Sequence, residues 1–467
     1  MTRCPHILFR WFFVACGVAL AAACAVGPDY QRPKFETTEN YKEQAEWKPS
    51  EPNDVLSRGP WWNIFGDDEL SALEAKIEIS NENVKAAAAA FDQARALVAQ
   101  ARAGFWPTVS AGVGAQRGAI GAVPSRTTVD ASVSGNWTLD IWGQIRRTVE
   151  SDRASAQASA AALAAATLSA QGELAIDYFL LRAQDQLQRI LDDIVVAEQQ
   201  SLKIAESRYR FGVAAKADVV SAQTQLLNSQ AQQISAKIQR GILEHAIAVL
   251  IGQTPASFSL TPSAMRAGVP TVPAGVPSTL LERRPDVAEA ERRMAAANAQ
   301  IGVAKAAFFP SLTLSGSDQY SNSTFSRLVS ASSRVWAVGP QLAETLIDGG
   351  LRRAQVAQAR AAYQASVASY RQTVLSGFEQ VEDQIVTLRV LEQQAVVEDA
   401  AVAAAIEAER LTLNQYKAGT VPYSSVITAQ TTRLASEETA LTVLSNRLQA
   451  SVALIEALGG GWTAAQL

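Results

Sequence analysis

The sequence contains the same unit twice, and this internal repeat restricts the fold more than any other feature. Three segments recur in order, at an offset that stays between 203 and 207 residues: 105–109 as 308–312, 209–213 as 416–420, and 222–224 as 429–431. An ordered series of matches at a nearly constant offset indicates a duplicated structural unit. We therefore expect both halves of the chain to fold in the same way.

The same order of periodicities appears in both copies. A first helix is predicted at 68–104 and 280–307, and it stops before a proline. Two runs with strand-like alternation follow. A helical stretch of nearly 70 residues comes next, and a last helix closes each copy after a break that contains glycine. These later helices are predicted at 143–211 and 349–418, then at 215–251 and 423–458.

The strand-like runs alternate residue by residue between apolar and polar side chains. Val129, Val133 and Leu139 share one predicted face, while Ser132 and Thr138 share the other. This period is typical of a strand with one apolar side and one wet side. Each run reaches the roughly 9–11 residues that a tilted strand needs to cross a bilayer. A soluble sandwich with one solvated face is the alternative interpretation.

Four strands cannot form a closed barrel by themselves. Single-chain outer-membrane barrels start at about eight strands, and an open sheet in lipid would leave its edge groups unpaired. The barrel must therefore be shared between chains. Two chains would give eight strands and little lumen, because side chains fill so small a barrel. The strand count thus favours three chains over two.

The long helices also require neighbours. A helix of about 70 residues is a rod of roughly 100 Å, which cannot pack within one globule. Part of the second rod shows the 4, 3, 4, 3 spacing of a coiled-coil seam, at Val374, Phe378, Val381, Ile385 and Leu388. A wall several helices wide is the economical arrangement. A cytoskeletal coiled coil would explain neither the strands nor the N-terminus.

The N-terminus is predicted to be a secretion signal. Arg3 and Arg10 supply positive charge, and the apolar run from Trp11 to Ala23 is too short to span a bilayer. Small residues directly before Cys24 resemble a bacterial lipobox, so we expect the Cys24 thiol to be acylated and to begin the mature chain. A buried thiol after ordinary signal cleavage is the alternative. No later apolar run approaches 18 residues, which argues against a helical transporter.

These boundaries divide the chain into segments. Pro270, Pro273 and Pro277 exclude a helix between the copies and predict an extended linker. We expect a lipoprotein signal at 1–23, a lipid-anchored extended segment at 24–66, the first helix–strand repeat at 67–264, the linker at 265–278, the second repeat at 279–458, and a tail at 459–467.

Composition argues against two other classes of function. The formal net charge is -4, with no basic surplus, so nucleic acid is not an expected partner. After signal removal the one remaining histidine is His245, which lies on an apolar helix without a Cys or His at metal-ligand spacing. No phosphate-binding glycine loop is present. We expect neither a catalytic site, nor a metal, nor a cofactor.

Several motifs together resemble one bacterial family. They are Cys24-Ala25-Val26-Gly27-Pro28-Asp29-Tyr30, the segment Trp61-Trp62 to Leu70, Leu280-Leu281-Glu282-Arg283-Arg284-Pro285-Asp286-Val287, the run from Ile301 to Pro310, Asp348-Gly349-Gly350, and the end from Ala457 to Trp462. From Cys24 to the C-terminus, the chain resembles the outer membrane factors of resistance-nodulation-division (RND) efflux systems, specifically the NodT-type lipoproteins that are similar to TolC and OprM.

This resemblance implies a mainly α-helical fold with membrane β-strands. It implies a TolC-like homotrimer in which a shared twelve-stranded β-barrel, with four strands from each chain, continues into a long α-helical coiled-coil barrel. The implied function is a passive exit duct for small toxic compounds in the cell outer membrane. The implied partners are a periplasmic adaptor (a membrane fusion protein), an inner-membrane RND pump and outer-membrane lipid.

Two groups of residues are candidates for the mechanism. The glycine-containing breaks permit helical hairpins whose tips are expected to dock the adaptor: Arg210, Phe211, Gly212 and Val213, and Lys417, Ala418, Gly419 and Thr420. Charged residues near those tips are candidates for a gate that closes the duct: Glu206, Arg208, Glu409, Arg410 and Lys417. A plain turn and a solvated surface are the respective alternatives.

Two questions stay open at the level of sequence. An export duct of a type I protein-secretion system would use the same fold with a different pump. The transported compound is not specified either, because a duct of this kind imposes little chemistry of its own.

Overall fold

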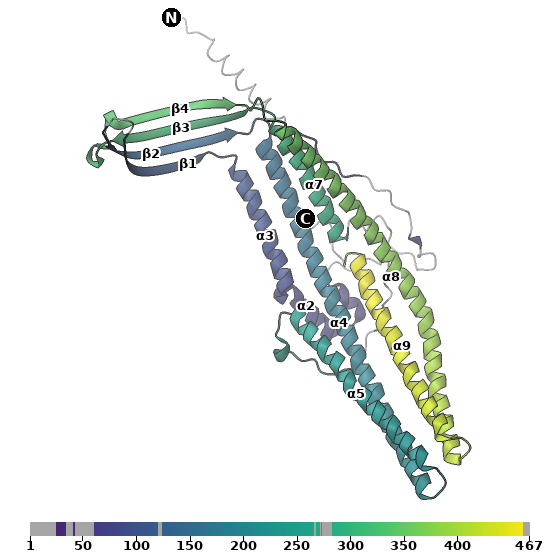
Figure 1. Ribbon diagram of the computed structural model, residues 1–467. Helices are drawn as coiled ribbons and strands as arrows, with labels where there is room; N and C mark the ends of the chain where they lie inside the picture. Colours follow the sequence, from purple (N-terminus) through teal and green to yellow (C-terminus); the bar gives the residue numbers. More distant parts are fainter. Residues whose placement is uncertain are drawn as a thin grey trace. The chain divides into compact units, whose positions relative to one another are not determined.

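The computed structural model describes residues 25–33, 41–42, 60–119, 124–265, 268–270, 272 and 283–460 (Figure 1). The chain forms two compact units, each built from three separate stretches of sequence. Unit 1 contains 1–35, 90–160 and 289–372, and unit 2 contains 36–89, 161–288 and 373–467. Both halves of the chain therefore contribute to each unit, as expected for a duplicated chain.

Unit 1 contains an antiparallel sheet of four strands in the order β1-β2-β3-β4 (Figure 1). The strands are β1 (Thr108–Gly118), β2 (Arg126–Leu139), β3 (Ser311–Asn322) and β4 (Arg334–Ala343). One hairpin comes from each half of the chain, and β2 pairs with β3 to join them. Strands β1 and β4 are the two edges, each paired on one side only within this sheet.

The register gives the sheet one apolar and one polar face. Val113 lies opposite Ala131, Trp137 opposite Leu314, and Leu312 opposite Leu342. Opposed residues in antiparallel strands point to the same side, so the apolar sets of all four strands coincide. The other face is polar, and there the hydroxyls of Ser110 and Ser134 are 2.9 Å apart. The predicted alternation and the strand number are confirmed.

Seven α-helices in the described part of the chain account for most of the structure. They are α2 (Asp68–Ser80), α3 (Glu82–Ala103), α4 (Gln144–Arg210), α5 (Lys216–Leu250), α7 (Pro285–Ala306), α8 (Leu351–Ala418) and α9 (Tyr423–Ala457). The long helices α4 and α8 contain 67 and 68 residues. No helix in the described ranges combines the length and the apolar composition needed to cross a membrane.

One predicted helix is wrong. The segment 68–104 is not continuous, because the backbone leaves the helical region at Asn81, with φ -66° and ψ 123°. The Asn81 side chain caps α3 by accepting hydrogen bonds from the amides of Asn83 (2.9 Å) and Val84 (3.1 Å). Its amide also donates to the Leu250 carbonyl at 2.8 Å. Asparagine stabilises a helix start in this way, and a long-range contact fixes it here.

Unit 2 has a hydrophobic core to which η2 (Trp61–Phe65) and helices α2, α4, α5, α8 and α9 contribute. The Trp61–Phe65 segment buries Trp61, Trp62 and Phe65, and the Phe65 ring packs 4.9 Å from that of Phe179. The predicted seam on α8 belongs to this core, where Val381 and Ile385 are fully buried. The seam spacing was therefore a correct guide to burial.

The segment that follows Cys24 is held firmly in unit 1. The Val26 amide donates to the Trp142 carbonyl at 3.0 Å, and Arg147 binds the Asp29 carboxylate at 2.8 Å. Gly27 and Gly302 lie so close that a Cβ on Gly27 would meet the Gly302 Cα at 2.5 Å. Cys24 itself, the signal segment, most of the proline-rich linker and the C-terminal residues 461–467 lie outside the described residues.

Candidate functional site: the tips of two helical hairpins

Unit 2 contains two helical hairpins, α4–α5 and α8–α9, and both tips are turns that glycine makes possible (Figure 1). At the first tip Gly212 has φ 73°, its amide donates to the Tyr209 carbonyl, and the Val213 amide donates to the Arg208 carbonyl. At the second tip Gly419 has φ 83° and the same two-bond pattern. This is the Schellman motif, which ends a helix with a left-handed residue.

The predicted docking residues at these tips face solvent. Phe211 is 79% exposed and Val213 is 66% exposed. Arg210, Lys417, Ala418 and Thr420 are exposed as well. In the single chain, the tip of the first hairpin therefore presents an uncovered apolar pair flanked by cations.

Arg208 joins the two hairpins. Its guanidinium group donates hydrogen bonds to the carbonyls of Tyr416 and Lys417, the second at 2.7 Å, and lies 4.7 Å from the Tyr416 ring centroid. These carbonyls belong to the last turn of α8, where unpaired acceptors and the helix dipole favour a cation. Arg208 thus caps α8 from the end of α4. In the described part of the chain no carboxylate pairs with Arg208, whose partners are these backbone carbonyls.

A second link between the hairpins involves Asp218 and Tyr416. The Tyr416 hydroxyl donates to the Asp218 carboxylate across 3.4 Å, and its ring packs edge-on against Tyr423 at 5.1 Å. Burial and the negative charge of Asp218 raise the pKa of Tyr416, so the phenol stays protonated and can donate. Our sequence analysis missed both residues. An acid in the first turn of α5 and a tyrosine at the end of α8 were the available signals.

The predicted gate residues do not form one cluster. Glu409 is buried and pairs with Arg433 of α9 at 2.9 Å. Arg410 pairs with Glu407 on the surface of its own helix, and Glu206 is exposed. Of the candidates, only Arg208 and the backbone of Lys417 meet across the hairpins. The charge of a residue in the sequence did not show which of these candidates pairs with another helix, because such contacts depend on which face of each helix points inward.

Replacing Arg208 with alanine is expected to loosen the α8 end. The last α8 carbonyls would lose a charged donor, and a hydrogen bond to a charged group contributes about 1.5–3 kcal/mol. Hydrogen-exchange mass spectrometry should show faster exchange in peptides that cover 415–421. Arg210→Ala is the matched control, because Arg210 is exposed two residues away. Equal exchange in the two variants would contradict the capping role.

Comparison with known proteins identifies the family. The model of the family described as outer membrane efflux protein matches residues 75–253 and 276–460. The chain belongs to this family. The two matched ranges contain both hairpins and all four strands.

Individual relatives extend over nearly the whole chain. The chain is 26% identical to the probable efflux pump outer membrane protein TtgC of Pseudomonas putida, over 95% of this chain and 94% of TtgC. It is 27% identical to the cation efflux system protein CusC of Escherichia coli, over 95% of this chain and 97% of CusC. The solved outer-membrane channel OprN superposes with a TM-score of 0.87 at 29% identity, covering 94% of this chain and 100% of OprN.

These findings confirm the TolC-like fold and the place of the chain among outer membrane factors. The chain is an outer-membrane channel of an efflux pump. The protein-secretion alternative is not favoured, because the matching family model and these relatives carry efflux names. The relatives are themselves efflux channels.

Proposed function

We propose that the chain works as a homotrimeric, passive exit duct without a catalytic step. The sheet carries the argument: it has an apolar face, a polar face and two free edges, β1 and β4. Edges unpaired in lipid cost several kcal/mol for each exposed group, so they must pair with other chains. Three copies would close a twelve-stranded barrel with the apolar face toward lipid and the polar face toward a lumen.

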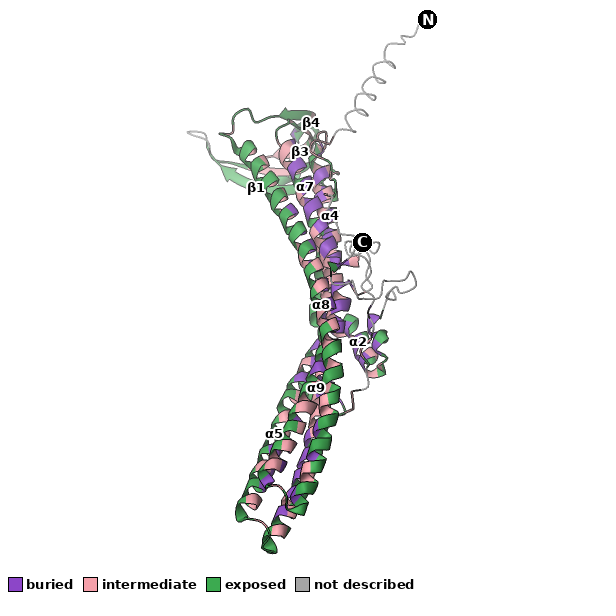
Figure 2. Ribbon diagram, turned by 90° about the vertical axis from the view of Figure 1, so that its right-hand side faces the viewer, coloured by how far each residue is buried: buried purple, intermediate pink, exposed green. Residues whose placement is uncertain are grey.

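The outer face of α5 supports assembly from several copies. Its large apolar residues are exposed in the single chain, and Figure 2 shows α5 mostly as exposed and intermediate residues. They recur at helical spacing, at Val220, Leu227, Ile234, Ile238 and Ile242. A continuous apolar stripe of this kind marks a contact surface. A neighbouring copy would cover it within the proposed trimer.

The proposed partners bind at different parts of the chain. The exposed tips, with Phe211 and Val213, would dock a periplasmic adaptor that links the channel to an inner-membrane RND pump. Acylation of Cys24 would add a lipid anchor two residues before Val26, whose amide donates to the Trp142 carbonyl. The cargo would be small toxic compounds, since relatives are named for toluene and for cations.

We further propose that the closed state of the duct depends on the links between the two hairpins. Both links, Arg208 to the α8 carbonyls and Tyr416 to Asp218, join separate hairpins close to their tips. Adaptor binding would exchange them for contacts of its own. Of the gate candidates from the sequence, this assignment keeps Arg208 and Lys417, whereas Glu409 and Arg410 pair within their own hairpin and Glu206 is exposed.

Removing both links is expected to raise conductance. The double variant Arg208→Met, Tyr416→Phe keeps the side-chain sizes nearly unchanged but deletes the guanidinium group and the hydroxyl that link the hairpins near their tips. In planar lipid bilayers its single-channel conductance should exceed that of the wild type several-fold. The pair Arg410→Met, Glu407→Gln is the matched control, because that ion pair lies on one exposed helix surface. Unchanged conductance in the first variant would remove these links from the gate.

A further inference from the structure

Helix α2 places an acid in the middle of its buried face. Leu70, Glu74 and Ile77 are each 0% exposed, and Leu73 is 4% exposed. Their spacing is that of one helix face, so Glu74 lies inside an apolar stripe. Neither carboxyl oxygen of Glu74 has a hydrogen-bond partner among the described residues. A buried carboxylate without a partner is strongly disfavoured relative to the neutral acid.

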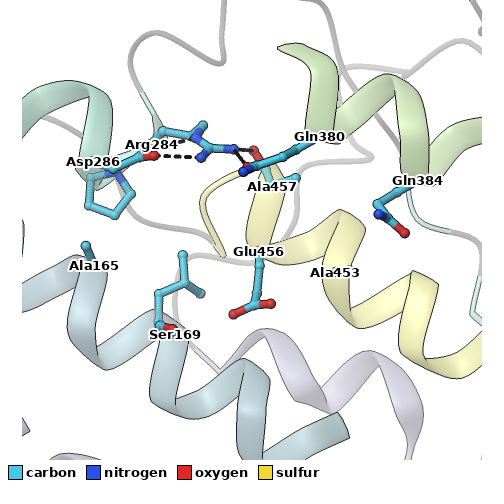
Figure 3. A pocket seen from close by; sticks show the side chains of 11 residues that line it. Ala165, Ser169, Arg284, Asp286, Gln380, Gln384, Ala453, Glu456 and Ala457 are labelled. Atoms are coloured by element: carbon cyan, nitrogen blue, oxygen red, sulfur yellow. Dashed lines mark hydrogen bonds and ion pairs between the residues drawn. The ribbon is translucent and has the colours of Figure 1, made fainter. Parts of the chain in front are cut away.

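A second acid, Glu456 of α9, acts on Glu74. Its carboxyl group packs directly on the backbone of α4, where a Cβ added at Gly172 would lie 2.0 Å from Oε1 of Glu456. Glycine disfavours a helix interior, and here it provides the space that this carboxyl occupies. Glu456 lines a pocket of about 380 Å3. In Figure 3 its carboxyl group is directed away from Arg284.

The charged groups around the two acids come from several elements. On α4, Glu173 acts on both Glu456 and Asp177, while Arg182 is occupied by Glu69 and Asp185. Arg284 also acts on Glu456, but its guanidinium group is bound to Asp286, to Gln380 and to the Ala457 carbonyl (Figure 3). Glu173 therefore opposes ionisation of Glu456, while Arg284, the cation that acts on it, is engaged with other groups.

Burial and repulsion both favour the protonated acids. Burial, and then the charge of Glu456, raise the pKa of Glu74 to about 9. Burial, and then the charge of Glu173, raise the pKa of Glu456 to about 7, while Arg284 lowers it. A proton on Glu456 removes the charge that acts on Glu74 and so favours release of the Glu74 proton.

We propose that the buried Glu74 is a proton-binding site that fastens α2 to the core of unit 2, and that the half-buried Glu456 of α9 tunes it. With Glu74 neutral, the apolar face of α2 stays packed on the core of unit 2. When both acids ionise, their repulsion and the lost hydration oppose that packing and loosen α2. This site is separate from the proposed duct, docking and gate functions, and it makes the attachment of α2 depend on pH.

The direction of the pH dependence follows from linkage. In an unfolded chain a glutamate has a pKa of about 4.3, well below the pKa of about 9 that Glu74 has in the folded chain. Between those values the folded chain holds a proton that the unfolded chain has released. The stabilisation is therefore complete at acid pH and is lost as the pH rises toward about 9.

Infrared spectroscopy of the detergent-solubilised full-length protein tests the site directly. At neutral pH we expect the wild type to show the C=O stretch of a protonated carboxylic acid, and Glu74→Gln to lack that part of the band. Glu78→Gln is the matched control, because Glu78 is exposed one turn later on the same helix. A wild-type spectrum without the protonated band, or one equal to that of Glu74→Gln, would overturn the proposal.

A series of melting curves at different pH values distinguishes an effect of the bound proton from a purely structural role of the Glu74 side chain. Between about pH 6 and pH 9 the melting temperature of the wild type should fall by about 2–4 °C more than that of Glu74→Gln. Glu78→Gln should follow the wild type. In Glu456→Gln the infrared band of protonated Glu74 should disappear at a lower pH than in the wild type, because the repelling charge is gone. This variant tests the site even if Glu74→Gln fails to fold. Parallel melting curves for wild type and Glu74→Gln, or an unshifted band in Glu456→Gln, would contradict the site.

Discussion

Gly419→Val is expected to abolish efflux while trimers still form. At φ 83° a β-branched residue is strongly strained, which costs roughly 1–3 kcal/mol. Any Cβ here would also lie 3.3 Å from Nη2 of Arg208, so the new methyl groups would displace that side chain. The turn and the α8 cap would fail together. Drug susceptibility of the variant should equal that of a strain without the channel.

Two further variants distinguish a specific effect on the turn at Gly419 from a general loss of folding. Gly419→Asn should keep more efflux than Gly419→Val, because asparagine adopts the left-handed conformation more readily. Asn414→Val changes an exposed position one turn earlier on α8 and should behave as wild type. Trimer content is measured in parallel by electrophoresis without heating. Normal drug tolerance in Gly419→Val would show that the tip geometry does not matter for function.

Ile238→Asp is expected to prevent trimer formation. Ile238 is 66% exposed in the single chain and lies in the centre of the apolar stripe on α5, between Ile234 and Ile242. Covering such a side chain contributes about 1.5–3 kcal/mol, and an unpaired carboxylate buried in its place opposes assembly further. The change is present in each copy. Size-exclusion chromatography with light scattering in detergent should therefore detect smaller species than for the wild type.

The neighbouring position provides the control for this experiment. Gln239→Asp introduces the same acid at an exposed polar residue, which the helix turns away from the stripe. We expect normal trimers from Gln239→Asp and efflux close to that of the wild type. A trimer of normal stability in Ile238→Asp would mean that another surface holds the copies together.

The secondary structure was largely predictable because its signals are local. Alternation identified the four strands, and the seven-residue spacing identified Val381 and Ile385 as buried. Glycines 212 and 419 were identified correctly as turn positions, since only glycine takes that backbone conformation readily. The break at Asn81 was missed because the residues on both sides of it favour a continuous helix. The hydrogen bond from the Asn81 side chain to the Leu250 carbonyl, which is distant in the sequence, favours the break instead.

The sequence by itself determined the duplicated order of helices and strands and the two-sided sheet of four strands, from which we propose that other chains close a barrel. Those properties follow from the periodicity of apolar residues and from the number of strands, and both can be recognised from residues that are close together in the sequence. Only the tertiary structure decided which charged and polar residues meet. Arg208 donates to the carbonyls at the end of α8 and Tyr416 donates to Asp218, although the partners are far apart in the chain. Such pairings depend on how helix faces pack, which no local pattern encodes.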